Sequence, residues 1–238
     1  MAIKRAIPTR EADSGSAVNP SRAGAYRESY TLPLGGGDYT FADEGSYFHA
    51  SNATLATGIA GHAAPVVADG VTKALLHLYN GGNKNIIPTY LFLEVTAAGT
   101  AGTIGYTTIY TDNADATARA SGGTAITPVN VKSDGSQTTG AVLYVGAVVT
   151  AMATPYKVGQ QIGREVIPVV QDTVLMRFGA PSASAHSGLV TSGTTVSHLI
   201  QDFAPIVIGP GGNLNISLIR PSQSGANSYQ FSFGYIER

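Results

Sequence analysis

The chain of 238 residues carries 14 Lys and Arg against 15 Asp and Glu, a formal net charge of -1, and only 12% of its residues are charged. This balance excludes a strongly basic nucleic-acid-binding protein and an acidic disordered tail. The chain contains no cysteine, which excludes disulfides, thiolate metal sites and a cysteine nucleophile. No segment approaches the roughly 18 to 20 uninterrupted apolar residues of a membrane span, and the amino end lacks the apolar run of a signal peptide, so we expect a soluble protein made in a cytoplasm.

Residues 1–37 are predicted to form an extended amino-terminal arm. The segment has few large apolar groups and is interrupted by prolines and glycines, so it cannot bury enough surface to fold alone. The arm also contains the only residues of the sequence that we predict to bind a neighbouring subunit. They are Arg5, Arg10, Arg22, Tyr26, Arg27, Tyr30 and Leu32. An ordinary frayed terminus is the alternative interpretation.

Residues 38–238 are predicted to form one β domain. Residues 39–68 give a weak signal, which we interpret as loop with room for one short strand. A strand at 74–80 ends at an Asn-Gly-Gly-Asn turn, and the strand at 85–95 is its predicted pairing partner. Pro88 lacks a backbone donor, so it should lie at a strand start, a sheet edge or a bulge.

Further short strands are separated by turns rich in Gly, Pro, Asn, Asp and Ser. They are predicted at residues 105–111, 127–132, 141–149, 164–168, 173–179, 196–200 and 204–208. No stretch indicates a helix of normal length. The pattern favours an all-β fold, an antiparallel β-sandwich of jelly-roll type with the extended arm, and a closed barrel is the alternative.

The last third of the chain carries the most regular pattern. Residues 213–218 alternate polar and apolar side chains, which places Leu214, Ile216 and Leu218 on one face of a sheet. Residues 228–235 alternate in the same way, with aromatic side chains on one side. The turn residues between the two strands predict an antiparallel hairpin, and we expect the carboxyl end to be tied into the sheet.

The side chains that could bind a metal do not form a recognisable motif. The five histidines are His49, His62, His77, His186 and His198. Their spacing is not that of a zinc site, and we expect His77 and His198 to be partly buried and hydrogen-bonded. Asp112, Asn113 and Asp115 could bind calcium, but they are also the usual residues of a hairpin tip.

Catalytic motifs are not found. The acids suggest no pair for glycoside hydrolysis, no serine lies on a nucleophile elbow, and the glycine clusters do not match a phosphate-binding loop. The aromatic strand could stack on bases, but no Lys or Arg flanks its rings, so packing in the core is favoured. The sequence therefore predicts a non-enzymatic protein with no catalytic residue, no cofactor and no metal.

Several strand and turn phrases resemble those of uncharacterised virion proteins of tailed bacteriophages. They are residues 127–131, 167–172, 205–212 and 221–224, followed by the aromatic strand and the terminal Glu237 and Arg238. The likeness covers roughly residues 70–238. It implies a structural role, most simply that of an auxiliary capsid protein, a cement or decoration protein on the lattice of the major capsid protein, often as a homotrimer.

The arm adds a physical reason for that role, because a segment that becomes ordered on a neighbour can clamp subunits, and several arms on one oligomer add avidity. We therefore expect the protein on the capsid surface of a virion after synthesis in the host cytoplasm, bound to the major capsid protein and to copies of itself. Nucleic acid and membrane are not expected partners. The alternatives are a tail or head-fibre module that attaches to host carbohydrate, and a sugar-active or lectin-like domain unrelated to virions.

Overall fold

The computed structural model describes residues 37–52, 57–63, 70–99, 105–112, 120–121, 123–135, 137–149, 152, 154–162, 169–179, 186–187, 198–219 and 225–238. The chain divides into two units, residues 1–40 and residues 41–238, and all strands named below belong to the second. The predicted arm at residues 1–37 thus lies almost wholly outside the described residues, and it stays a prediction.

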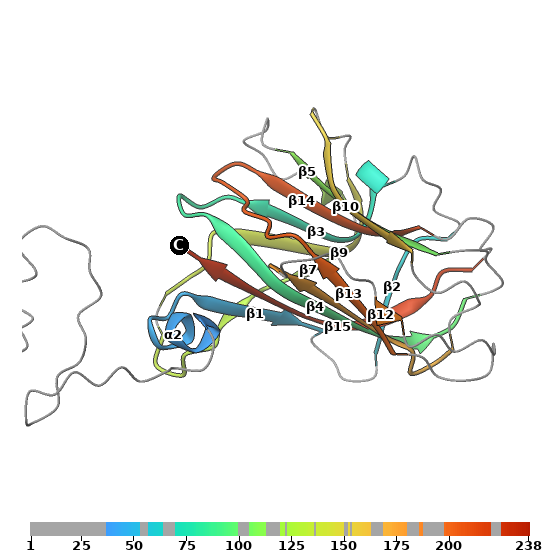
Figure 1. Cartoon of the computed structure of the whole chain (residues 1–238), viewed down its shortest axis with the longest axis horizontal. Coiled ribbons are helices and arrows are strands. Elements are labelled where there is room, and N and C mark those ends of the chain that lie inside the picture. The colour runs from blue at the N-terminus through green and yellow to red at the C-terminus, as the bar shows by residue number, and fades with distance from the viewer. Residues whose placement is uncertain are drawn as a thin grey trace, which may run out of the picture. The chain divides into compact units, whose positions relative to one another are not determined.

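The strands form two sheets, seen as two layers in Figure 1. The larger sheet has the order β12-β13-β11-β4-β15-β1-β8, and β2 also pairs with β15. Its strands are β1 (Tyr47–Ser51), β2 (Ile59–Ala60), β4 (Ile86–Ala97), β8 (Val129–Asn130), β11 (Thr173–Phe178), β12 (His186–Ser187), β13 (His198–Phe203) and β15 (Ser228–Glu237). The smaller sheet has the order β10-β5-β14-β3-β9-β6, and β7 also pairs with β9. Its strands are β3 (Lys73–Asn80), β5 (Tyr106–Asp112), β6 (Ala120–Ser121), β7 (Thr124–Ile126), β9 (Ala141–Val149), β10 (Tyr156–Ile162) and β14 (Asn213–Ile219).

The strand ladders are antiparallel with one exception, since β11 and β13 run parallel. The prediction of an all-β, mostly antiparallel fold is therefore confirmed. The one α-helix in the described ranges, α2 (Gly37–Asp43), has seven residues. It is far too short to cross a bilayer, and no other helix in this part of the chain could do so.

The hydrophobic core lies between the two sheets, and its largest contribution comes from β15. The four aromatic side chains of β15 are each at most 4% exposed: Tyr229, Phe231, Phe233 and Tyr235. The ring of Tyr235 stacks on Phe48 of β1 and on Phe233, with centroids 5.6 Å apart in both pairs. The prediction that these rings pack in the core is confirmed, and burial prevents them from stacking on bases.

The predicted alternation in β14 is also confirmed, but both faces of this strand are buried. Leu214 and Ile216 have no exposed surface and belong to the core between the sheets. Asn213, Asn215 and Ser217, on the opposite face, are equally inaccessible. Backbone carbonyls of the turn that precedes β3 accept hydrogen bonds from Asn215 and Ser217. A polar layer therefore covers the outer side of the smaller sheet at this strand.

Two predicted strand pairings are wrong. The strands at 213–218 and 228–235 do not form a hairpin, because β14 lies in the smaller sheet and β15 in the larger one. The same holds for the predicted partners at 74–80 and 85–95, which are β3 and β4 of opposite sheets. In both cases the connection crosses from one sheet to the other, so the apolar faces meet across the core. A period of two in the sequence fixes the face of a strand but does not identify its neighbour.

Smaller features agree better with the sequence. Pro88 lies at a bulge, because the register between β4 and β15 shifts beside it, between Gly234 and Tyr235. The carboxyl end is tied into the larger sheet, where β15 lies between β4 and β1. The strand β10 was not predicted, since its sequence contains Gly159 and adjacent glutamines. The predicted strand at 164–168 lies outside the described residues.

Candidate functional site

The residues selected from the sequence do not come together in the structure. The seven arm residues from Arg5 to Leu32, and also Asn113 and Asp115 of the possible calcium site, lie outside the described residues. The carboxylate of Asp112 is 1% exposed, and its Oδ2 accepts a long hydrogen bond of 3.4 Å from the backbone N–H of Thr154. Within the described ranges, no three His, Asp or Glu side chains are grouped so that they could hold a metal ion.

Two histidines lie in separate hydrogen-bonded environments in the two sheets. His77 in β3 is hydrogen-bonded, as expected, but it is fully and not partly buried, and its Nδ1 lies 2.6 Å from the Asn215 Oδ1. Burial lowers the pKa of His77, an effect that its hydrogen bond to the Asn215 Oδ1 partly offsets. His49 in β1 lies 2.8 Å from the Ser232 Oγ, and burial lowers its pKa too. Both imidazoles are therefore neutral at pH 7 and act as ordinary hydrogen-bonding groups.

The remaining histidines also have structural partners where their side chains are described. His198 was expected to be partly buried, but it is exposed and bonds to the Thr173 Oγ1 at 2.7 Å. His62 donates from Nε2 to the carbonyls of Ala147 at 2.9 Å and Ala74 at 3.2 Å, which joins the segment after β2 to β9 and β3. His186 belongs to β12 at the edge of the larger sheet.

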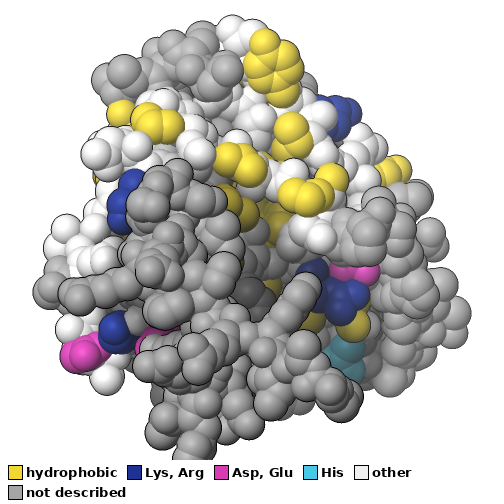
Figure 2. All heavy atoms as spheres, turned by 60° about the vertical axis from the view of Figure 1, so that its left-hand side comes forward, with side chains coloured by type: hydrophobic (Ala, Val, Ile, Leu, Met, Phe, Trp, Pro, Cys, Tyr) yellow, Lys and Arg dark blue, Asp and Glu magenta, His cyan; other side chains and the backbone are white. Residues whose placement is uncertain are grey.

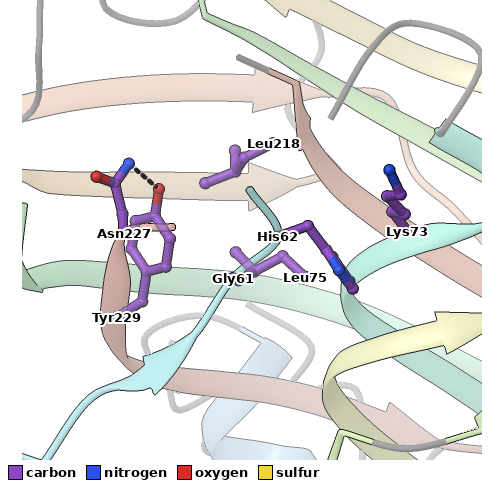
Figure 3. A pocket seen from close by; sticks show the side chains of 7 residues that line it. All are labelled: Gly61, His62, Lys73, Leu75, Leu218, Asn227 and Tyr229. Atoms are coloured by element: carbon purple, nitrogen blue, oxygen red, sulfur yellow. Dashed lines mark hydrogen bonds between the residues drawn. The ribbon is translucent and has the colours of Figure 1, made fainter. Parts of the chain in front are cut away.

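A small cavity lies beside His62 (Figure 3). Its lining residues are Gly61, His62, Lys73, Leu75, Leu218, Asn227 and Tyr229. Asn227 donates to the Tyr229 hydroxyl at 3.0 Å and accepts from the Gly99 N–H at 2.6 Å, so the polar groups on this side are already satisfied. The volume is about 10 Å³, which is room for one water molecule at most. This cavity is too small to bind a substrate.

A larger cavity, lined by polar residues and glycines, lies at the other end of β3, where three segments meet. We call it the turn cavity, and its lining residues are Asn80, Gly82, Asn83, Lys84, Thr138, Gly140 and Glu237. They come from the β3–β4 turn, from the loop before β9 and from the end of β15. Figure 1 shows the carboxyl end beside the β3–β4 turn, and the backbones of Asn85 and Arg238 exchange two hydrogen bonds there. The volume of the turn cavity is about 100 Å³.

Glu237 is the acidic group of the turn cavity. Only 6% of the residue is exposed, and its Oε1 accepts hydrogen bonds from the Gly140 N–H at 3.0 Å and from the Thr139 hydroxyl. Because Thr139 donates its one proton to Glu237, the Tyr235 hydroxyl must be the donor in its 2.7 Å bond to the Thr139 Oγ1. Burial, together with the charge of Glu237, raises the pKa of Tyr235 well above its usual value. Tyr235 therefore stays a neutral donor, and it orders the loop before β9.

Asn80 fixes the opposite wall of the turn cavity. Its Nδ2 donates to the carbonyls of Lys84 at 2.7 Å and Ile208 at 2.9 Å, and its Oδ1 accepts from the Gly82 N–H at 3.1 Å. The Gly81 N–H donates to the Gly140 carbonyl at 2.9 Å, which joins the turn to the loop before β9. The wall is therefore held in place by side-chain and backbone hydrogen bonds.

Sequence reasoning missed this site. The Asn-Gly-Gly-Asn phrase was interpreted only as a turn, and Glu237 only as part of a carboxyl-terminal phrase. Thr139 and Glu237 are 98 positions apart in the chain, so no local spacing could have linked them. The only signal of this site in the sequence is the acidic residue Glu237 in the strand 228–237. Acidic residues are usually exposed, so Glu237 gives no reason by itself to expect a buried carboxylate.

Apolar side chains are exposed on the edges of both sheets. The exposed large apolar residues in the described ranges are Val129, Val131, Val142, Val148, Tyr156, Val158, Val170 and Val207. Val129 belongs to β8, the edge strand of the larger sheet, and Tyr156 and Val158 belong to β10, an edge strand of the smaller sheet. Figure 2 shows one face of the molecule, on which hydrophobic side chains gather in the upper part and few Lys and Arg are seen.

Comparison with known proteins found no matching family model, no similar curated protein and no similar solved structure. A function has to be argued from the residues of this chain.

Proposed function

We propose that the protein is a non-enzymatic structural component of a bacteriophage particle, a cement or decoration protein that binds and stabilises the capsid lattice. The observation that carries the proposal is the apolar surface on the edge strands. Val129 is 58% and Val131 43% exposed at the β8 edge, and Tyr156 is 55% and Val158 40% exposed on β10. Apolar side chains at sheet edges are a liability for an isolated protein, and they suit one that contacts neighbouring subunits.

The proposal includes two features of the fold, the jelly-roll type of the sandwich and the extended amino-terminal arm. Consecutive strands that lie in opposite sheets, as β3 and β4 do and as β14 and β15 do, support a sandwich of jelly-roll type. An extended arm at residues 1–37 would bridge neighbouring coat subunits, and a homotrimer would present three arms to the lattice. The major capsid protein is the proposed partner, and the capsid surface is the proposed location.

The location of the polypeptide in purified particles tests the proposal directly. Immunogold labelling and cross-linking mass spectrometry should place the protein on the shell, in contact with the major capsid protein. Deletion of residues 1–37 should leave a folded domain that no longer binds to shells assembled without this protein. A position on the tail would contradict the cement function. Full binding by the truncated chain would contradict the role of the arm.

A carbohydrate-binding attachment module is the second candidate, and one cluster on the outer face of the larger sheet favours it. The Ser232 Oγ lies 2.8 Å from the His49 Nε2 and 3.0 Å from the Tyr90 hydroxyl. A side chain at Gly234 would lie 2.5 Å from atoms of both Tyr47 and Tyr90, so the two tyrosines close over this glycine. Partly exposed aromatic rings beside polar groups are suited to sugars. If this function holds, a glycan array should show binding that Tyr90→Ala abolishes.

A further inference from the structure

The turn cavity contains a buried carboxylate that is only half satisfied. Both hydrogen bonds to Glu237, from Gly140 and Thr139, go to Oε1. The ion pairs seen in the described part of the chain, such as Lys132 with Asp134 and Arg177 with Asp202, do not include this carboxylate. A buried charge is costly unless it is paired, fully hydrogen-bonded or bound to a metal ion. The second oxygen, Oε2, is not one of the buried atoms without a partner in the described residues, so it is open to the water or ion that occupies the cavity.

The walls of the turn cavity have the chemistry of a site for a hard cation. Five of the seven lining residues are polar or charged and the other two are glycines, and Asn80, Asn83, Thr138 and Glu237 carry side-chain oxygens. Carboxylate, amide and hydroxyl oxygens, completed by water, are the ligands that Ca²⁺ and Mg²⁺ prefer. On the same measure the cavity beside His62, at about 10 Å³, holds one water at most, so a volume of about 100 Å³ has room for one ion with several of its waters.

Lys84 lines the same cavity and offers the competing explanation. Its side chain is exposed in the β3–β4 turn and forms no ion pair with Glu237. An ammonium group separated from the carboxylate by water would partly neutralise Glu237 without a bound ion. A cation in the cavity would instead be repelled by Lys84. The two explanations thus predict opposite effects when the lysine is neutralised.

We propose that the turn cavity binds a hard divalent cation, with Glu237 as the charged ligand and Asn80, Asn83 and Thr138 as neutral oxygen donors. A site with a single carboxylate is weak, so we expect a Kd of about 10⁻⁴ to 10⁻³ M, the range of the weakest calcium modules. The ion joins the β3–β4 turn, the loop before β9 and the end of β15, so its binding stabilises the fold. This inference does not depend on the proposed function.

Thermal unfolding of the full chain, first treated with a chelator, tests the proposal. Ca²⁺ or Mg²⁺ at about ten times the Kd should raise Tm by roughly 3 to 5 °C above a NaCl solution of equal ionic strength. Glu237→Gln keeps an acceptor for Gly140 and Thr139 but removes the charge, so it should abolish the rise in Tm. Asp134→Asn is the matched control, because it neutralises an acid whose side chain is 77% exposed, and the rise should be unchanged.

Lys84→Gln separates the two explanations and keeps the test decisive if Glu237→Gln does not fold. Removal of the competing charge should lower the Kd several-fold, as measured by calorimetric titration with CaCl₂ or MgCl₂. If Lys84 is the counter-ion of Glu237, this variant is instead less stable and neither salt restores it. The proposal is overturned by that result, by a wild-type Tm that responds equally to divalent salts and NaCl, or by an unchanged rise in Glu237→Gln.

Discussion

At the scale of single residues, Gln171 is held in an unusual backbone conformation. Its φ of 75° is the only positive value at a non-glycine residue among the described ranges. The turn that contains it is closed by a bond of 3.0 Å from the Asp172 N–H to the Val169 carbonyl, and the Asp172 carboxylate accepts from the Val169 N–H at 2.7 Å. A left-handed residue costs a non-glycine side chain about 1 to 2 kcal/mol, which the closed turn offsets.

Gln171→Gly should therefore stabilise the protein. Glycine adopts a positive φ without strain but loses more backbone entropy on folding, so the net gain should be about 0.5 to 1 kcal/mol. Urea denaturation measures the change. Gln171→Ala, which keeps the strained φ, is the control and should show no such gain. A loss of stability in the glycine variant would mean that contacts of the glutamine side chain outweigh the strain.

His77 makes the stability of the protein depend on pH. Its folded pKa is lowered from 6.5, mainly by burial, and its Nε2 is buried without a partner. The unfolded state therefore binds more protons, so stability is full above about pH 6.5 and falls as the pH drops below that value. His77→Gln should reduce the slope of unfolding free energy between pH 7 and 5 by up to about 1.4 kcal/mol per pH unit. Urea titrations at several pH values test this, and an unchanged slope would contradict it.

At the scale of elements, the β3–β4 turn and the loop before β9 touch through two glycines. A side chain at Gly140 would place its Cβ 2.4 Å from the Cα and 2.6 Å from the backbone N of Gly82. Both neighbours are backbone atoms, which cannot move aside without shifting the turn. The walls of the turn cavity can approach each other only because neither residue has a side chain.

Gly140→Ala should destabilise the protein by about 1 to 3 kcal/mol, because the turn and the loop must separate. Gly209→Ala is a suitable control, since the nearest atom to its Cβ would be 3.8 Å away, in ordinary contact, and we expect a change within about 0.5 kcal/mol. Denaturant midpoints of the two variants give the comparison. Equal midpoints would show that the turn moves at no cost.

The elements also show how far the sequence predicts the fold. Strands such as β14 and β15 were found because one of their faces is continuously apolar and packs in the core. β10 was missed, because it is a mostly exposed edge strand in which Gly159 leaves room for the ring of Phe203. The pairing partners of the strands could not be predicted. Consecutive strands lie in opposite sheets here, and no local sequence pattern shows to which sheet a connection leads.

At the scale of the whole molecule, contacts between distant segments decide both the site and the surface. Side chains of the two sheets bond across the core, as the Thr107 hydroxyl does to the Gln201 Oε1 at 2.8 Å. The turn cavity likewise needs Asn80, Thr139 and Glu237 from three segments. Such a site forms only when the two sheets pack together. The sequence could therefore exclude familiar motifs but could not locate the turn cavity.

The apolar edge of the larger sheet should matter for assembly and not for folding. Val129→Lys with Val131→Lys should change the unfolding free energy by less than about 1 kcal/mol, because both side chains are exposed, yet should prevent binding to capsid shells. Val142→Lys, at an exposed valine of the interior strand β9, is the control and should bind normally. Co-sedimentation with undecorated shells measures binding. Normal binding by the double variant would argue against this edge as a contact.

The position of β15 has a consequence for how the protein is made. This strand fills the middle of the larger sheet, between β4 and β1, although it follows the other strands of both sheets in the sequence. The larger sheet cannot close while residues 228–237 are still inside the ribosome, so it must assemble after translation has passed them. A frameshift or early stop codon before residue 228 would leave two half-sheets with open edges, a product that aggregates or is degraded.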